Sequence, residues 1–418
     1  MGSFIIQGSK GLEGIVDIGG SKNAALPIIA STVICPREYI LENIPDIEDV
    51  KDMFDILHTM GCKIQYEDGV ALIDTRDLNT FKVPEKLVRK IRSSIILMGA
   101  VLQRTGNVEI AYPGGCEIGL RPIDLHLKGL RKLGVEIVEK NGLLIGTVKE
   151  PEGIEISLDY PSVGATENIM LYAVGVPGKT TIYNPAREPE IVDLQNFLNI
   201  CGYEISGAGT GVITIEGKNI KSTETVEYKI ISDRIEAGTY LSAAASMKSK
   251  IYIRNIEKSH FKSITSIYED AGCEIRETKG TIVIKNSGRL NAIEKVTTQP
   301  YPGFPTDMQA QFMASMATAN GITIIEETVF DSRFKHVPEL QKMGANITTI
   351  GRVAVVEGVE RLTGAEVESK DLRGGAALVI AALGAEGTTK INNIYHINRG
   401  YEKFVTKLQN LGVIITEV

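Results

Sequence analysis

The sequence predicts an α/β protein in which six similar units are divided between two domains of three units each. Three observations lead to this prediction: a glycine that recurs after helical segments, a buried helix that recurs with the same spacing, and a polar stretch near the middle of the chain. Units of about 70 residues repeated six times exceed the usual size of one domain, which argues for two.

The first repeated element is a helix that ends in glycine and continues into an alternating strand. It occurs six times, as LHTMGCKI (57–64), LRKLGVEI (130–137), LNICGYEI (198–205), YEDAGCEI (268–275), LQKMGANI (340–347) and LQNLGVII (408–415). Glycine here fits the left-handed conformation that commonly ends a helix. The alternation that follows predicts a strand, a short turn and a second strand.

The second repeated element is a helix rich in small residues. It begins in the segments 21–31, 92–102, 162–174, 233–247, 304–317 and 371–383. These segments are apolar nearly all round, which predicts that the helices are buried. The polar stretch STETVEYK (222–229) indicates that the break between the two domains falls near 225–232.

Composition narrows the classes of function. The 418 residues carry a net charge of −7 and no basic run, which argues against general nucleic-acid binding. The first residues lack the pattern of a signal peptide, and no apolar stretch has the length of a membrane span. The five scattered cysteines include no CxxC pair, so neither a disulfide framework nor a zinc site is predicted. A cytoplasmic protein with reduced thiols is the simplest interpretation.

One cysteine differs from the others in its surroundings. Cys62, Cys201 and Cys273 each adjoin a repeat glycine, which predicts that they are buried packing residues, and Cys35 follows the first small-residue helix. Cys116 instead follows two glycines in the loop-like stretch AYPGGCEIGLRPIDLHLKGLRKLG (111–134). A surface turn with an incidental thiol and a reactive site both remain open from the local sequence.

Polar residues stand at the start of each small-residue helix. Asp233 and Ser162 are explained by ordinary helix capping. Capping does not explain Lys22, Arg92 and Arg373, because a cation at a helix N-terminus opposes the helix dipole. We therefore expect an anionic ligand with more than one phosphate or carboxylate, bound in a cleft between the two domains.

Eight blocks of sequence, spread over the whole chain, resemble the UDP-N-acetylglucosamine 1-carboxyvinyltransferases of the enolpyruvyl transferase family. They are GGSKNAALPI (19–28), PGGCEIGLRPIDLHL (113–127), SVGATENIM (162–170), AREPEIVDLQNFL (186–198), FPTDMQAQF (304–312), TVFDSRFKHVPEL (328–340), DLRGGAALVIAAL (371–383) and YHINRGYEKF (395–404). The resemblance implies two inside-out α/β barrel-like domains, each of three repeats with buried helices and outer sheets. It places the domains at 22–229 and at 1–21 plus 230–418, with the active site in the interdomain cleft.

The resemblance also implies a reaction. In this family the enolpyruvyl group of phosphoenolpyruvate is transferred to the 3-hydroxyl of UDP-N-acetylglucosamine, and phosphate leaves, in the first committed step of peptidoglycan synthesis. The chemistry is an addition followed by an elimination, which needs an acid, a base and cations around the phosphate and carboxylate. It implies no cofactor, no metal, no nucleic-acid partner and no membrane insertion, and it leaves the oligomeric state open.

Four residues match the family's catalytic positions. Cys116 matches the acid that delivers a proton to C3 of phosphoenolpyruvate, on a glycine-containing lid loop, and it can form a covalent adduct. Asp307 matches the base for the sugar hydroxyl, and Lys22 and Arg399, with Arg121, match the cations that hold phosphoenolpyruvate.

The other matched residues bind substrate. Asn23 and Arg92 match sugar-nucleotide and phosphate contacts, and Asp371 and Arg373 match closure residues near the reacting centre. The residues expected to form the nucleotide pocket are Arg121, Pro122, Ile123, Asp124, Leu125, Ser162, Val163, Gly164 and Val329. Tyr160, followed by Pro161, stands where some family members carry a lysine two residues before the serine of SVGAT, which leaves a diphosphate contact from this position open.

Three alternatives compete with this interpretation. The shikimate-pathway enolpyruvyl transferase shares the fold but lacks the PGGC lid, so Cys116 followed by RPIDLH argues against it. A non-catalytic UDP-sugar-binding regulatory paralogue is opposed by the intact set of Lys22, Cys116, Asp307 and Arg399. RNA 3′-end cyclases are related in fold, but the acidic charge disfavours RNA.

Overall fold

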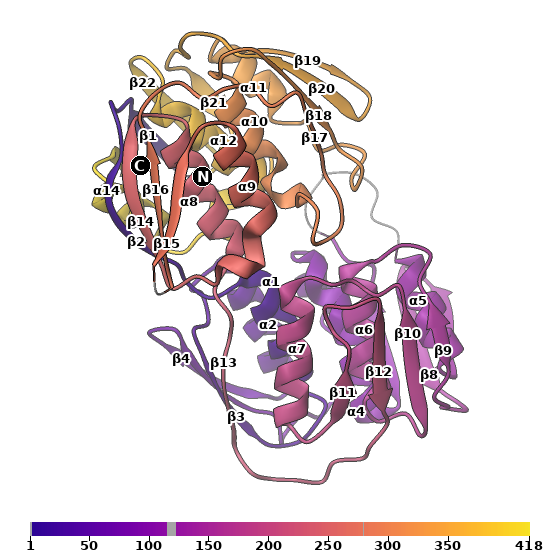
Figure 1. Ribbon diagram of the computed structural model, residues 1–418. Coiled ribbons are helices and arrows are strands. Elements are labelled where there is room, and N and C mark those ends of the chain that lie inside the picture. Colours follow the sequence, from indigo (N-terminus) through magenta and orange to yellow (C-terminus); the bar gives the residue numbers. More distant parts are fainter. Residues whose placement is uncertain (1, 115–122, 279) are drawn as a thin grey trace. The chain divides into compact units, whose positions relative to one another are not determined.

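The computed structural model describes residues 2–114, 123–278 and 280–418, so Cys116, Arg121 and Pro122 lie outside the described residues. The chain forms two compact units (Figure 1). The first unit contains residues 20–114 and 123–231, and the second contains residues 2–19, 232–278 and 280–418. Each unit has its own cluster of buried hydrophobic side chains.

The first unit combines short strands with helices. Its helices are α1 (Lys22–Ser31), α2 (Glu48–Thr59), α3 (Glu85–Val88), the 3-10 helix η1 (Arg92–Ile96), α4 (Leu97–Thr105), α5 (Asp124–Lys132), α6 (Val163–Ala173) and α7 (Pro189–Ile200). Its strands are β3 (Glu38–Glu42), β4 (Lys63–Glu67), β5 (Val70–Asp74), β6 (Asn107–Ala111), β7 (Val135–Lys140), β8 (Leu143–Val148), β9 (Glu155–Ser157), β10 (Lys179–Tyr183), β11 (Glu204–Ser206), β12 (Val212–Glu216) and β13 (Val226–Lys229).

The second unit is built in the same way. Its helices are α8 (Arg234–Ala245), η2 (Lys258–Phe261), α9 (Lys262–Asp270), η3 (Thr306–Met308), α10 (Gln309–Met316), α11 (Val337–Lys342), α12 (Leu372–Leu383), α13 (Tyr395–Asn398) and α14 (Phe404–Asn410). Its strands are β1 (Ser3–Gln7), β2 (Glu13–Asp17), β14 (Ser249–Arg254), β15 (Glu274–Thr278), β16 (Thr281–Asn286), β17 (Lys295–Thr297), β18 (Ile322–Glu326), β19 (Asn346–Ile350), β20 (Val353–Glu357), β21 (Glu366–Glu368), β22 (Thr388–Asn392) and β23 (Ile414–Glu417).

The sheets repeat one topology. Four of them have the orders β13-β3-β5-β4, β9-β10-β12-β11, β2-β14-β16-β15 and β17-β18-β20-β19. In each, the first two strands are parallel, and the remaining neighbours are antiparallel. A three-stranded sheet, β6-β8-β7, carries an isolated parallel bridge from Lys82 to Glu109 where the other sheets have their parallel strand.

The sixth sheet is completed from the other end of the chain. Its order is β21-β22-β1-β23. Strand β23 therefore pairs with β1, and not with a strand next to it in sequence. Phe4 and Ile6 of this strand are fully buried, and β1 is antiparallel to both β22 and β23. The six-repeat α/β fold expected from the sequence is thus confirmed, and its last repeat is closed by a segment far away in sequence.

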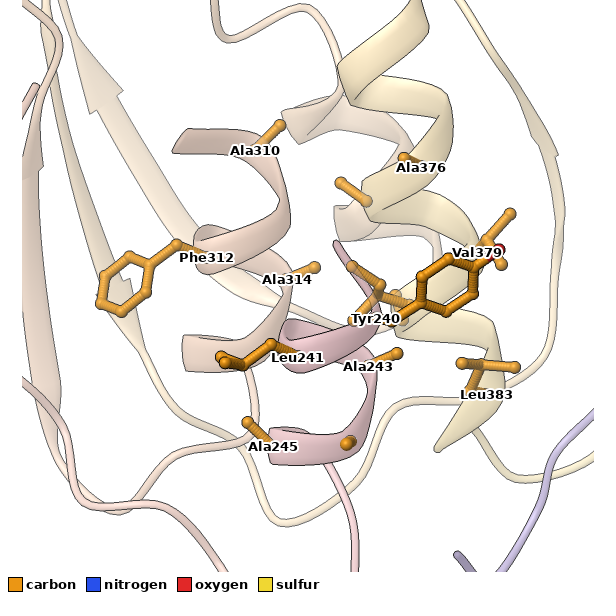
Figure 2. Packing of buried hydrophobic residues seen from close by; sticks show 14 of the residues in the cluster. Tyr240, Leu241, Ala243, Ala245, Ala310, Phe312, Ala314, Ala376, Val379 and Leu383 are labelled. Carbon is orange, nitrogen blue, oxygen red and sulfur yellow. The ribbon is translucent and has the colours of Figure 1, made fainter. Parts of the chain in front are cut away.

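The helices rich in small residues form the centre of each unit, as predicted. Every residue of α8 and α12 is buried. Figure 2 shows Tyr240 and Ala243 of α8, Ala314 of α10 and Val379 of α12 in one cluster. Small residues matter because the helices are close: a Cβ added at Gly238 would lie 2.8 Å from the sulfur of Met308.

The repeat glycines end helices in the way that the sequence predicts. The six glycines, with their φ angles, are Gly61 (101°), Gly134 (85°), Gly202 (104°), Gly272 (106°), Gly344 (91°) and Gly412 (87°). Each directly follows the residue that caps the C-terminus of α2, α5, α7, α9, α11 or α14. A residue with a side chain would be strained in this left-handed region.

Two predicted helices differ from a plain α-helix at their start. The segments at 92–102 and 304–317 begin with the 3-10 helices η1 and η3 before α4 and α10. The predicted caps at Ser162 and Asp233 are confirmed: the Ser162 hydroxyl accepts from the Ala165 amide, and the Asp233 carboxylate accepts from the Ile235 and Glu236 amides.

The predicted burial of the repeat cysteines is also confirmed. Cys62, Cys201 and Cys273 are buried free thiols, and Cys35 is buried as well. Burial raises the pKa of Cys62, Cys201 and Cys273 to about 12. These three thiols therefore stay protonated, and they are poor nucleophiles at neutral pH.

Candidate functional site

The Asp307 carboxylate lies between two buried arginines of the second unit. Arg333 donates from Nη2 to Oδ1 of Asp307 at 2.8 Å, and Arg373 donates from Nη2 to Oδ2 at 3.0 Å. The arginine side chains are 2% and 5% exposed, whereas the Asp307 side chain is 27% exposed. Two cations in a poorly solvated setting favour the ionised carboxylate, which can accept a proton from a ligand at its exposed side.

Arg333 is a residue of this group that the sequence analysis missed. It follows β18, and its guanidinium lies over the Phe330 ring, 5.1 Å from the centroid. Its Nε and Nη1 are buried without a hydrogen-bond partner among the described residues. One signal was present in the sequence: Arg333 is a charged residue between Phe330 and Phe334 within the family block 328–340.

Asp371 fixes the start of the helix that carries Arg373. Its carboxylate accepts hydrogen bonds from the Arg373 amide at 3.0 Å and from the Gly374 amide at 2.9 Å. Gly374 permits a close approach here, since an added Cβ would lie 3.0 Å from the Cβ of His336. Burial lowers the pKa of His336 to about 4, although Asp371 opposes this shift, so His336 is neutral at pH 7.

Two further predicted residues, Val329 and Arg399, lie in the same unit. The Val329 amide donates to the Glu327 carboxylate at 2.9 Å, and Glu327 also accepts from the Thr306 hydroxyl at 2.9 Å. Glu327 therefore ties Val329 to the residue that precedes Asp307. Arg399, which is 8% exposed, follows α13, a helix that packs against α12.

In the first unit, Lys22 is the first residue of α1 and already has a carboxylate partner. Its Nζ lies 3.0 Å from Oδ2 of Asp49, a buried residue of α2. Arg373 is likewise paired with Asp307. The helix-start cations Lys22 and Arg373 are thus balanced by acidic side chains that are remote in sequence. The sequence argument for an anionic ligand did not include these ion pairs. Asn23, next to Lys22, is half-buried.

The two described segments predicted to hold the nucleotide are brought together at the starts of α5 and α6. Ile123 precedes α5, and Asp124 and Leu125 form its first turn. Ser162 caps α6, and Val163 and Gly164 follow it. An added Cβ at Gly164 would lie 3.0 Å from Cε1 of His126, so the two helix starts touch through this histidine.

His126 is held as a neutral hydrogen-bond donor. Oδ1 of Asn168 accepts from the Gly99 amide at 2.6 Å, which fixes the orientation of the side-chain amide. Nδ2 of Asn168 then donates to the Ile95 carbonyl at 2.8 Å and to Nδ1 of His126 at 3.0 Å. His126 must therefore carry its proton on Nε2. Burial and the nearby Arg92 lower the pKa of His126 to about 4.

Arg92 connects this cluster to the first helix. It begins η1, which packs against both α1 and α6. Burial lowers the pKa of Arg92, and its charge acts on His126. The described residues of the first unit thus gather Arg92 and the starts of α5 and α6, which together offer a cation, backbone amides and one imidazole N–H.

Among the described residues, no group of three or more histidine, cysteine, aspartate or glutamate side chains is placed to hold a metal ion. Within the same residues, no helix combines the length and the hydropathy that a membrane crossing requires.

Comparison with known proteins adds evidence on the family. The model of the EPSP synthase (3-phosphoshikimate 1-carboxyvinyltransferase) family matches residues 6–408. The enolpyruvyl transferase NikO from Streptomyces tendae has a similar fold, with a TM-score of 0.90 at 24% identity over 100% of this chain and 99% of that one. EPSP synthase from Acinetobacter baumannii gives a TM-score of 0.76 at 19% identity over 100% of both chains.

Curated relatives are more similar in sequence. UDP-N-acetylglucosamine 1-carboxyvinyltransferase 2 from Caldanaerobacter subterraneus subsp. tengcongensis is 48% identical over 100% of both chains. UDP-N-acetylglucosamine 1-carboxyvinyltransferase from Thermotoga maritima is 46% identical over 100% of this chain and 99% of that one. The chain therefore belongs to the enolpyruvyl transferase family and, within it, to the UDP-N-acetylglucosamine 1-carboxyvinyltransferases.

Proposed function

We propose that this chain transfers the enolpyruvyl group of phosphoenolpyruvate to the 3-hydroxyl of UDP-N-acetylglucosamine. In the addition step, the sugar oxygen bonds to C2 of phosphoenolpyruvate, loses its proton to a base, and C3 gains a proton from an acid. In the elimination step, C3 loses a proton, the double bond re-forms and the C2–phosphate bond breaks. The products are the enolpyruvyl ether and phosphate.

The observation that most supports this proposal is the setting of Asp307. A base for a sugar hydroxyl must be ionised, fixed in orientation and open to the ligand. The Asp307 carboxylate is bound at one oxygen by Arg333 and at the other by Arg373, and its side chain keeps 27% exposure. We therefore assign Asp307 as the base, with the two arginines setting its orientation and charge.

The remaining roles follow the family resemblance. We assign Cys116 as the acid at C3, and Lys22, Arg121 and Arg399 as cations for phosphoenolpyruvate. We assign the nucleotide to the starts of α5 and α6, where Ile123–Leu125 and Ser162–Gly164 converge. Since these residues are divided between the two units, we propose that the reaction needs both. We place it in the cytoplasm, in agreement with the four buried free thiols.

Incubation with each acceptor separates the proposed function from its rivals. The protein is mixed with phosphoenolpyruvate and either UDP-N-acetylglucosamine or shikimate 3-phosphate, and phosphate release and product mass are followed. We expect phosphate and an enolpyruvyl product only with the UDP-sugar. Turnover with shikimate 3-phosphate and none with the UDP-sugar would favour the shikimate-pathway activity. Binding of the UDP-sugar without any phosphate release would favour a regulatory paralogue.

A further inference from the structure

A buried tyrosine hydroxyl lies where three central helices of the second unit meet. The Tyr401 hydroxyl is 2.8 Å from Oγ1 of Thr239 on α8, 3.3 Å from Nε2 of Gln311 on α10 and 3.2 Å from Nη1 of Arg373 on α12. Tyr401 is 3% exposed, and its ring packs on Phe404 at a centroid distance of 4.8 Å. This hydroxyl is therefore beyond the reach of substrate, but it directly contacts Arg373.

The direction of each hydrogen bond at this hydroxyl is determined by its neighbours. Arg373 can only donate. Nε2 of Gln311 also donates to the backbone carbonyl of Asp307 at 2.8 Å, which fixes the orientation of that amide. The Thr239 hydroxyl donates to the Ile235 carbonyl at 2.8 Å, so it accepts from Tyr401. The second N–H of Gln311 is shared between the Tyr401 and Thr239 hydroxyls, each 3.3 Å from Nε2. The Tyr401 oxygen thus donates to Thr239 and accepts from Arg373, with the shared Gln311 N–H as a further donor.

Arg373 is held at both ends of its guanidinium. Nη1 donates to Tyr401 and Nη2 donates to the Asp307 carboxylate, while the guanidinium carbon lies 5.6 Å from the centroid of the Tyr401 ring. Burial by itself lowers the pKa of Arg373, but Asp307, Tyr401 and Asp233 outweigh it and raise the pKa. The guanidinium is therefore charged, and its Nη1 has to keep an acceptor because it is buried.

We infer that Tyr401 is a positioning residue of the transfer reaction, whose hydroxyl holds the Arg373 guanidinium against the Asp307 carboxylate. The inference rests on the proposed function, in which Asp307 is the base. Without the hydroxyl, Nη1 of Arg373 loses its acceptor and the guanidinium turns toward another one. The hydrogen bond from Arg333 to one oxygen of Asp307 is kept, but the bond from Arg373 no longer fixes the other oxygen. Base catalysis depends on that orientation, so turnover should fall.

Other ionisable groups lie near the ion pair of Arg373 and Asp307. Asp233 acts on both Arg373 and Tyr401, and Glu327 accepts a hydrogen bond from Thr306, which adjoins Asp307. Buried His336 lies near Asp371 and Arg333. Since Tyr401→Phe alters none of these groups, a change in the pH profile of this variant reports on Arg373 and Asp307.

The first test is the steady-state kinetics of Tyr401→Phe. We expect kcat to fall roughly tenfold, the effect of losing one hydrogen bond to a charged group, with both KM values changed by less than about twofold. The acidic limb of the pH–kcat profile should move to higher pH, because Asp307 loses part of its cationic support. In an Asp307→Asn background, the same change should lower kcat much less, since the two residues act as a unit.

Two other tyrosines of the same unit provide matched controls. The hydroxyl of Tyr240 on α8 is fully buried and has no hydrogen-bond partner among the described residues, so Tyr240→Phe should leave kcat and the pH profile unchanged. Tyr268 on α9 donates to Ser242 at 2.7 Å and lies 3.1 Å from the Ser315 hydroxyl. Tyr268→Phe therefore removes a structural hydrogen bond, and it should lower thermal stability without moving the pH profile.

A measurement that needs no turnover keeps this inference separate from the proposed function. The ionisation of Asp307 is followed by carbon-13 NMR of labelled aspartate carboxyls, and the signal is assigned by its loss in Asp307→Asn. We expect a higher protonation midpoint in Tyr401→Phe than in wild type, and no change in Tyr240→Phe. Inactive wild-type protein would refute the proposed function, and the midpoint would still decide the role of Tyr401. An unchanged midpoint, or wild-type kcat and pH profile in Tyr401→Phe, would overturn the inference.

Discussion

Replacement of His126 by glutamine should make the stability of the first unit less dependent on pH. His126 is buried, and its Nδ1 accepts a hydrogen bond from Asn168, so a proton cannot be added there without losing that bond. Burial and Arg92 lower its pKa from 6.5 to about 4. The unfolded chain therefore binds more protons than the folded one between these values, and folding is weakened as pH falls below 6.5.

The size of the effect follows from the two pKa values. Between pH 7 and pH 5, a shift from 6.5 to about 4 removes roughly 2 kcal/mol of the free energy of unfolding. Glutamine does not titrate, so His126→Gln should lose roughly that much less than wild type over the same interval. The measurement is urea unfolding followed by far-UV circular dichroism at both pH values, without ligand.

An exposed histidine of the same unit serves as the control. His58, in the last turn of α2, is exposed, so His58→Gln should retain the pH dependence of the wild type. Equal pH dependence in wild type and His126→Gln would refute the reasoning, because it would mean that His126 is as easily protonated in the folded chain as in the unfolded one.

Three further predictions concern the base, the thiols and the nucleotide segments. Asp307→Asn should keep its fold by circular dichroism but lose stability, because two buried arginines lose their counter-charge. It should lower phosphate release by about 10²–10⁴-fold, the usual loss when a general base is removed, and near-normal release would exclude that role. Iodoacetamide should modify Cys116 in the native protein and spare Cys62, Cys201 and Cys273, because burial raises the pKa of these three thiols to about 12. Peptide mass spectra showing the reverse would contradict both the reactive Cys116 and the inert buried thiols. Gly129→Ala should destabilise the protein by about 1–3 kcal/mol and weaken UDP-sugar binding, because the new Cβ would lie 2.4 Å from Cδ1 of Ile169 and force α5 from α6. Ile169→Ala is itself destabilising because Ile169 is fully buried, but in that background Gly129→Ala should cost less in calorimetry than it does in wild type. A single Gly129→Ala variant with wild-type stability would refute the close packing.

The repeat could be predicted from the sequence because it depends on local chemistry. The helix-ending glycines, the caps at Ser162 and Asp233 and the burial of Cys62 follow from residues within a few positions. The partners of β1 could not be predicted in this way, since its register with β22 and β23 is set by segments almost a whole chain apart.

The candidate site shows the same division. Asp307 and Arg373 were found through family motifs, but their ion pair joins residues that are 66 positions apart. Arg333 and Tyr401 were missed because each matters only through a tertiary neighbour, Asp307 for the first and Arg373 for the second. No local pattern marks a tyrosine hydroxyl whose three partners come from three different helices.

The strand borrowed by the last sheet has a consequence for synthesis on the ribosome. The first unit lies between residues 20 and 231, so all of it has emerged before the main part of the second unit is made. Strand β1 must then wait for β22 and β23, which are translated roughly 380–410 residues after it, or roughly 20–80 s at about 5–20 residues per second. During that interval the segment SFIIQ has no sheet to enter. The nascent chain therefore carries an unpaired apolar strand, available to chaperones, until β23 is released from the exit tunnel.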